Sequence, residues 1–223
     1  LIFIFLLKES LSLFGTQNFL GFIFGTDWYP ISDPPKFGIL PLILGSLWVT
    51  AGAIVIAVPI GVASAIYIAE VAHGGIKEFL KVAVELLAAI PSIVLGFLGV
   101  IALAPVLKLI FNLNSGLTAL AGSVMLAFMA MPTIISIIED AITSVPKSFK
   151  EGSIALGATR WQTIYRVVIP AAASGIVAAI MLGVGRVIGE TMAVLMVTGN
   201  AAIIPTSILQ PVRTLTATIA AEM

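Results

Sequence analysis

Arg186 and Glu190 are the residues of this 223-residue chain whose types and spacing best suit chemistry. Both lie in a nearly apolar run, residues 167–223, and a charge at the centre of a bilayer costs about 2.5–3.5 kcal/mol on insertion scales. Residues four apart on one helix share a face and can pair, and an arginine offers planar donors to an oxyanion. The pattern predicts either an ion pair that orders helix packing or a weak anion site that lines a membrane path.

Two glycines beside these charges are also four positions apart. We expect Gly185 and Gly189 to let a neighbouring helix approach closely. The string 183–189 has the spacing G-x-G-x-x-x-G, which only superficially resembles a dinucleotide fingerprint, and it sits in a membrane helix with no strand before it. The sequence therefore does not predict a nucleotide site here.

The composition indicates an all-α integral membrane protein with one domain, residues 1–223. The chain is 60% hydrophobic and 10% charged, with a mean hydropathy of +1.17, whereas soluble domains carry about 25% charged residues. The formal net charge is zero, which gives no argument for nucleic acid. The chain has no cysteine, so thiol chemistry and disulfides are excluded.

Long uncharged runs locate the membrane helices, because about 20 apolar residues cross a bilayer and lipid offers no partner to free backbone groups. Proline inside three of the runs predicts kinks. We expect the first helix to be truncated and a sixth span to lie beyond this fragment. The expected spans are 1–7 (partial), 40–69, 84–107, 117–138 and 170–199.

The polar segment 139–169 separates two of these spans and has the signals of two short helices. Ser148 with Glu151, and Thr159 with Gln162, fit the capping-box pattern. Gly157 between them suits a left-handed helix end. The sequence predicts a helix near 149–156, a glycine turn, and a second helix from 160 that meets its next boundary at Pro170. We interpret this elbow as a rigid lever. A structured linker on the membrane surface is the alternative, and flanking spans disfavour a DNA-binding helix-turn-helix.

Loop charges set the expected orientation, because cytoplasmic loops carry an excess of lysine and arginine. Placing the elbow in the cytoplasm puts the segment 70–81 on the same side, with six basic residues against four on the other. The segment 14–37 is rich in aromatic residues, glycine and proline, and we expect it at the outer interface.

Three further polar or aromatic features have ordinary interpretations. Glu70 and His73 have the E-x-x-H spacing of metal ligands, but the chain has one histidine and we expect surface side chains. Lys81 and Glu85 are expected to pair along a helix, with a contact to the elbow or a gate as the alternative for Glu85. Trp161 is expected to be a packing or interfacial anchor. We expect no metal, cofactor or catalytic residue.

The elbow resembles the cytoplasmic signature of ABC-importer permeases, E-A-A-x3-G-x9-I-x-L-P. Glu151, Gly157 and Pro170 keep its spacing, with Gly152 and Ser153 in place of the alanines and Val167 and Ile169 as aliphatic exchanges. The strings 185–200 and 85–92, together with the segment 37–67, are similar to the PstC-type permease subunit of the bacterial phosphate ABC importer. The sister PstA-type permease shares the arginine and the Gly-Glu-Thr, but the continuation Met-Ala-Val-Leu-Met fits PstC better.

The resemblance implies a type I ABC-importer (MetI-like) helix bundle that moves inorganic phosphate inward by alternating access, with Arg186 and Glu190 in the phosphate path. It also implies a bacterial or archaeal inner-membrane location, a PstA-type partner permease, ABC ATPase subunits and an extracytoplasmic phosphate-binding protein. The chain has no G-x-x-x-x-G-K-[ST] motif, so the expected protein is not an enzyme and a separate subunit hydrolyses ATP. The residues expected to couple to the ATPase are Glu151, Gly152, Ser153, Ala155, Gly157 and Pro170.

Under this resemblance, Glu190 has two hypothetical roles: it holds Arg186 when the path is empty, and it accepts a proton from a hydrogen phosphate hydroxyl, which sulfate lacks. Other interpretations stay open. In one alternative, the protein is still an ABC-importer permease but its cargo is molybdate or sulfate. In two others, it belongs to another class of protein: a channel or ion-coupled carrier, or an anchor protein that transports nothing.

Overall fold

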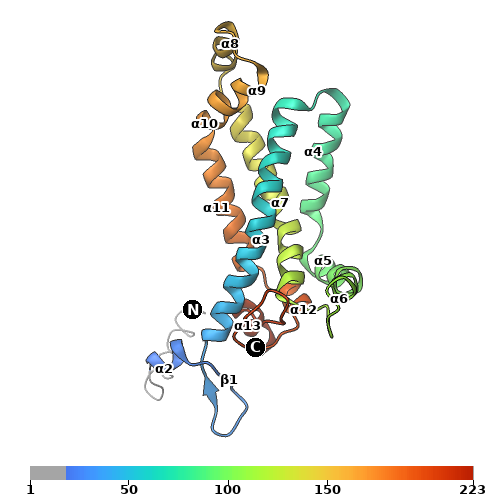
Figure 1. Cartoon of the computed structure of the whole chain (residues 1–223), viewed down its shortest axis with the longest axis vertical. Helices are drawn as coiled ribbons and strands as arrows, with labels where there is room; N and C mark the ends of the chain where they lie inside the picture. The colour runs from blue at the N-terminus through green and yellow to red at the C-terminus, as the bar shows by residue number, and fades with distance from the viewer. Residues whose placement is uncertain (1–18, 223) are drawn as a thin grey trace, which may run out of the picture.

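The computed structural model describes residues 19–222, so the expected partial span 1–7 lies outside the described residues. The described chain is mostly helical and contains one short β-hairpin. Three helices, α3 (Leu40–Ile66), α7 (Ala119–Thr143) and α11 (Ala173–Gly189), run along the long axis of the molecule (Figure 1). The elbow projects from one end of these helices and the hairpin from the other.

Helix α7 lies at the centre and is the most buried of the long helices. Thr118 caps its first turn by accepting a hydrogen bond from the Ala121 amide at 3.2 Å. Its side chains are buried on most of its faces, against both α3 and α11. A Cβ placed on Gly61 of α3 would lie 2.9 Å from Ile134 of α7, so small residues permit this close packing.

Helix α11 packs on α7 through a stripe of small residues at every fourth position: Gly175, Ala179, Gly183 and Val187. A Cβ on Gly175 would lie 2.4 Å from Ala141, and one on Gly183 would lie 2.7 Å from Ile134. No helix of the described chain approaches Gly185 or Gly189, so their expected role stays a prediction for a partner helix. Both are exposed, and a Cβ at either would meet nothing within 4 Å, because they lie on the other side of α11.

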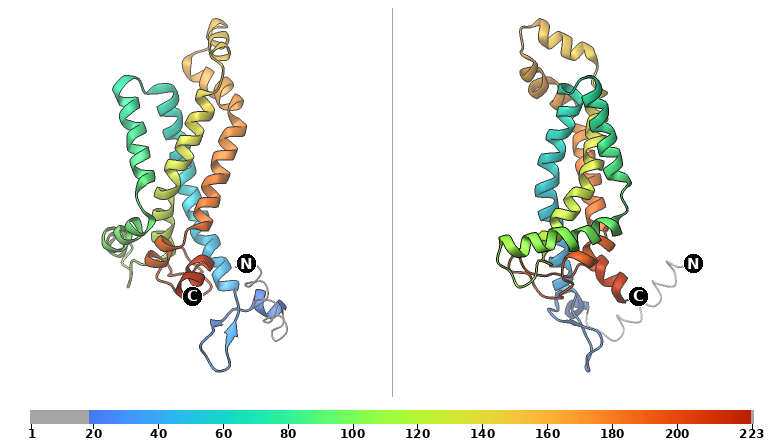
Figure 2. Two further views of the ribbon diagram at one scale, coloured as in Figure 1. Left: turned by 180° about the vertical axis from the view of Figure 1, so that it is seen from behind. Right: turned by 90° about the vertical axis from the view of Figure 1, so that its right-hand side faces the viewer.

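The expected span 84–107 is divided in two. Helix α4 (Gly74–Ala89) runs beside the bundle and ends at Ile90, which is extended with ψ 125°. Pro91 disfavours helical geometry in the residue before it, which accounts for the break. The chain then continues as α5 (Ser92–Leu98), the π-helix η2 (Gly99–Leu103) and α6 (Ala104–Ile110), which lie across the end of the bundle (Figure 2).

The expected span 170–199 is also interrupted. Helix α9 (Arg160–Thr163), the π-helix η3 (Ile164–Val168) and α10 (Ile169–Ala171) bend by 69° into α11. The break falls after Pro170 rather than at it, because proline is tolerated in a first helical turn. A second break follows Gly189, before α12 (Met192–Val197).

The end opposite the elbow holds the short remaining elements. They are α2 (Phe19–Phe24), the antiparallel strands β1 (Trp28–Tyr29) and β2 (Lys36–Phe37), and α13 (Leu215–Glu222). Trp28 pairs with Phe37 in register. The Trp28 indole donates to Glu222 at 3.0 Å, and Arg213 pairs with the same carboxylate at 2.9 Å. These contacts join the hairpin to the C-terminal helix.

Three described helices are long and apolar enough to cross a membrane: Leu40–Val71, which includes the π-helix η1 (Tyr67–Val71), Ser92–Ile110 and Ala119–Thr143. A fourth is added if the bent pair Arg160–Ala171 and Ala173–Gly189 counts as one span. The all-α membrane fold is therefore confirmed, and the arrangement of six spans remains a prediction.

Candidate coupling surface and anion path

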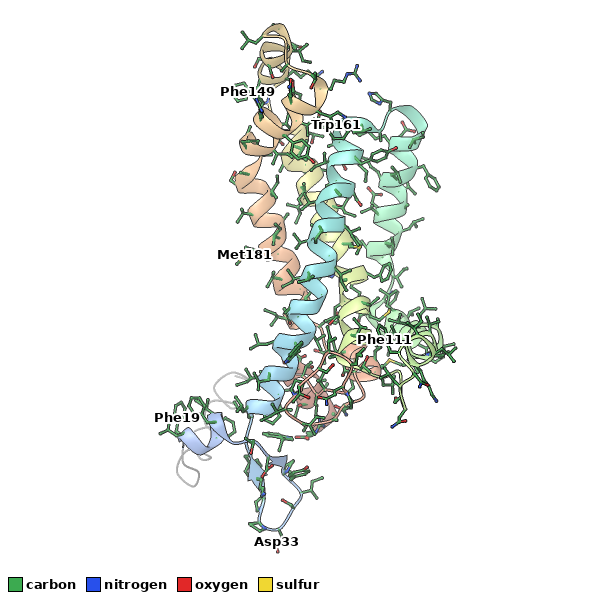
Figure 3. The ribbon with its side chains drawn as sticks, viewed as in Figure 1. Phe19, Asp33, Phe111, Phe149, Trp161 and Met181 are labelled. Atoms are coloured by element: carbon green, nitrogen blue, oxygen red, sulfur yellow. The ribbon has the colours of Figure 1, made fainter. Side chains whose placement is uncertain are left out.

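The elbow has the two-helix form that the sequence predicts. Helix α8 (Lys147–Ala155) carries Glu151, Gly152 and Ala155 on an exposed surface. Gly157 follows the helix end with φ +89°, the left-handed geometry that favours glycine. Figure 3 places Phe149 and Trp161 in this elbow, far from the hairpin tip at Asp33.

One of the two predicted capping boxes is confirmed. The backbone amide of Gln162 donates to the Thr159 hydroxyl at 3.3 Å. The backbone amide of Thr159 donates to the side-chain oxygen Oε1 of Gln162 at 2.9 Å. The prediction of a second capping box, at Ser148 and Glu151, is wrong. Helix α8 begins at Lys147 behind Pro146, so Ser148 already lies inside the first turn and does not cap it.

Large apolar side chains cover the outside of the elbow. Leu156 is 91% exposed, and Phe149, Ile154, Trp161 and Tyr165 are exposed as well. The Trp161 ring lies 6.3 Å from that of Tyr165, centroid to centroid. A concentrated apolar surface on a projecting segment is typical of a protein-binding site.

Two polar contacts stabilise the elbow: one lies within it, and the other connects it to a membrane helix. The Ser153 hydroxyl lies 3.0 Å from that of Thr163, so it ties α8 to α9. Lys150 on α8 pairs with Glu70 in η1, at the end of α3. Ser153 is thus a brace inside the elbow, and Lys150 links the elbow to a membrane helix.

A second ionic contact lies on the same end of the molecule. Glu139 is buried at the end of α7, and its Oε1 lies 2.8 Å from Lys81 Nζ and 3.9 Å from Lys77 Nζ, both on α4. The expected pair of Lys81 with Glu85 is wrong, because Lys81 extends to α7 instead. Glu85 lines a cavity of about 150 Å³ beside Glu139 and Asp140. The described residues contain no cluster of three or more potential metal ligands.

Arg186 lies exposed on α11 and does not pair with Glu190 in the described structure. Its Nη1 donates to the Thr133 hydroxyl of α7 at 3.0 Å. The prediction that the two residues share one helix face is wrong, because α11 ends at Gly189. Glu190 is extended, with φ −72° and ψ 136°, so the side chains no longer follow helical spacing.

Glu190 is held instead by the segments that follow it. Its Oε1 accepts from the Ala193 amide at 3.4 Å, and its backbone carbonyl accepts from the Thr216 hydroxyl at 2.8 Å. It also lines a cavity of about 10 Å³ together with Ser46, Thr50, Thr214 and Thr216. A cavity of this size has room for about one water molecule. Arg186 and Glu190 therefore lie near the same break in the helix but have different partners: Arg186 contacts α7, and Glu190 contacts α12 and α13.

Sequence reasoning missed Thr133 and Thr216 as partners of Arg186 and Glu190, and it missed Lys150 and Glu139 as members of ion pairs between elements. Glu139 had a detectable signal, since it is a carboxylate at the end of a 25-residue apolar helix. The other three have ordinary sequence surroundings, and only their distant partners identify them.

The comparisons with known proteins agree with this architecture. The family model for the binding-protein-dependent transport system inner membrane component matches residues 57–221. The chain is 43% identical over 216 residues to the probable ABC transporter permease protein YqgH of Bacillus subtilis, covering 94% of this chain and 70% of that protein. It is 39% identical to the phosphate transport system permease protein PstC of Mesorhizobium japonicum, covering 96% and 69%, and 36% identical to that of Haemophilus influenzae, covering 96% and 72%.

Solved structures of ABC transporters share the fold. A crystal structure of an amino acid ABC transporter with histidines matches with a TM-score of 0.57 at 20% identity, over 81% of this chain and 75% of that chain. An inward-facing MetNI methionine ABC transporter matches with a TM-score of 0.54 at 24% identity, over 68% of each. The helix bundle therefore shares its fold with these solved ABC transporters, and the chain belongs to the family of binding-protein-dependent transport system inner membrane components.

Proposed function

We propose that this chain is one permease subunit of an ATP-driven importer that carries inorganic phosphate into the cell. The relatives named PstC phosphate permeases, at 36–39% identity over nearly the whole chain, support the cargo. The observation that carries the proposal is Arg186, a cation exposed on a helix of a membrane bundle. Exposing such a charge to lipid costs free energy. In a hydrated path, water and a passing anion would solvate it instead.

The coupling role follows from the elbow. Its exposed apolar side chains offer a surface to a cytoplasmic ATPase subunit, and Lys150 links that surface to α3. ATP-driven movement of the elbow would then reorient α3 and α11 and give alternating access. In this proposal the elbow faces the cytoplasm of a bacterial or archaeal cell, and ATP hydrolysis belongs to the separate ATPase.

Further partners complete the importer. A PstA-type permease supplies the other half of the path, and an extracytoplasmic binding protein delivers phosphate to the hairpin end. The family description, binding-protein-dependent transport, supports the second of these partners.

The test is reconstitution of this chain with the products of neighbouring genes in liposomes. We expect ATP-dependent uptake of radiolabelled phosphate and ATP hydrolysis that phosphate with its binding protein stimulates. Sulfate and molybdate are the matched competitors. Preferred uptake of one of them would replace phosphate as the cargo, and uptake driven only by an ion gradient would contradict the ABC mechanism.

A further inference from the structure

Thr133 is the residue that positions Arg186. It follows Pro132 in the middle of α7, and its hydroxyl oxygen accepts the hydrogen bond from Arg186 Nη1 at 3.0 Å. The two residues are 53 positions apart and come from neighbouring helices. The contact fixes one nitrogen of the guanidinium and leaves its other N–H groups available, because an arginine has five donors.

The hydroxyl hydrogen of Thr133 is also available. Hydroxyls inside helices commonly donate to the carbonyl four residues before them. On α7 itself, Ser123 does so to Ala119 and Thr143 does so to Glu139. Within the described residues, the Thr133 hydroxyl makes no such bond and only accepts, from Arg186. One O–H group that donates to none of the described residues therefore lies next to a cation.

The surroundings of the pair are open on one side. Arg186 is exposed, and a Cβ added to its neighbour Gly185 or Gly189 would meet nothing of this chain within 4 Å. The opposite side of α11 is closed by the packing of Gly183 on Ile134. An oxyanion could therefore approach the pair only from the open side, where Arg186 offers N–H groups and Thr133 offers its O–H.

We infer that Thr133 and Arg186 together bind one tetrahedral oxyanion during transport. Thr133 holds the guanidinium and donates its hydroxyl hydrogen to an oxygen of the anion, while Arg186 donates to the anion and balances its charge. A neutral donor beside a single cation gives a weak site, which suits a path that must release its cargo. This inference rests on the proposed function, because it assumes that an oxyanion passes Arg186.

The test compares Thr133→Val with Thr133→Ser in the complete reconstituted importer. Valine keeps the shape and removes the hydroxyl, whereas serine keeps it. Because a hydrogen bond to a charged group is among the stronger ones, we expect Thr133→Val to raise the KM for phosphate by about ten- to hundredfold. Thr133→Ser should stay within about threefold of the wild type. Thr143→Val, on the same helix with an internally bonded hydroxyl, is the matched control and should leave KM unchanged.

Three outcomes separate this inference from a structural role and from the proposed function. An unchanged KM in Thr133→Val, with normal phosphate uptake by the wild type, would overturn the role of Thr133 alone. Equal losses in Thr133→Val and Thr133→Ser, with a lowered melting temperature, would assign Thr133 to packing and overturn the inference. A wild-type complex that moves no oxyanion would overturn both this inference and the proposed function.

Discussion

Lys150 on α8 forms an ion pair with Glu70, which lies in the π-helical end of the membrane helix α3. The two residues are 80 positions apart, and their side chains are 25% and 13% exposed. The elbow is thus attached to the bundle in three ways: by the covalent chain from α7, by the covalent chain into α11, and by this contact to the end of α3. A movement of the elbow can therefore reach three membrane helices at once.

Reversal of one charge, Lys150→Glu or Glu70→Lys, is expected to lower the phosphate moved per ATP hydrolysed. The free energy lost with the ion pair should lie between two limits. An exposed pair contributes up to ~1 kcal/mol, and removing one partner from a buried pair costs ~3–5 kcal/mol. The double exchange restores opposite charges and should recover most of the coupling. Transport and ATP hydrolysis measured on the same liposomes check this. An unchanged ratio in both single variants would contradict the link.

The apolar elbow surface predicts loss of ATPase binding when a charge is introduced. Leu156→Asp is expected to weaken co-purification of the ATPase subunit while helix content stays unchanged, because this residue is 91% exposed in the described chain. Ile31→Asp is the matched control, since Ile31 is 98% exposed at the opposite end. Retention of the ATPase by Leu156→Asp would place the coupling surface elsewhere.

The packing of α11 on α7 predicts different outcomes for two nearby glycines. Gly183→Val is expected to lower stability by about 1–3 kcal/mol, because its Cβ would lie 2.7 Å from Ile134 and overpack the interface. Gly185→Val has open space within the chain and should leave the isolated subunit nearly unchanged. Thermal unfolding in detergent compares the two. Equal melting temperatures would mean that the small-residue stripe does not control this interface.

Glu190→Gln tests the proposed discrimination between phosphate and sulfate. A carboxylate accepts the hydroxyl hydrogen of hydrogen phosphate, and the amide does so less well, so the preference for phosphate is expected to fall by about tenfold, or ~1.4 kcal/mol. Competition between labelled phosphate and unlabelled sulfate measures the preference. Transport with unchanged preference would remove this role from Glu190.

Removal of the buried carboxylate at the elbow end should weaken the attachment of α4. Glu139→Ala leaves Lys81 and Lys77 without their partner, and the expected loss of stability is about 1–3 kcal/mol. Glu85→Ala is the control, because Glu85 forms no ion pair in the described residues. Thermal unfolding of the two variants provides the comparison, and a larger effect of Glu85→Ala would contradict the assignment.

Local signals in the sequence determined the helical character of the protein and the form of the elbow. Uncharged runs located α3 and α7, Thr159 with Gln162 capped α9, and Gly157 ended α8. These features depend on residues a few positions apart, where backbone geometry decides the outcome. The spacing from Glu151 to Pro170 also identified the class of membrane protein.

Only the tertiary structure decided which residues meet. Arg186 bonds to Thr133 rather than Glu190, Lys81 pairs with Glu139 rather than Glu85, and Gly183 rather than Gly185 faces a neighbour. In each case the choice depends on where a helix ends or how it is rotated against α7. A helix end after Gly189 or a rotation of α11 moves a side chain to another face, and spacing along the chain does not specify either. The sequence by itself therefore determined the helical character, the form of the elbow and the positions of the charged residues along the chain, and the packing around α7 determined their partners.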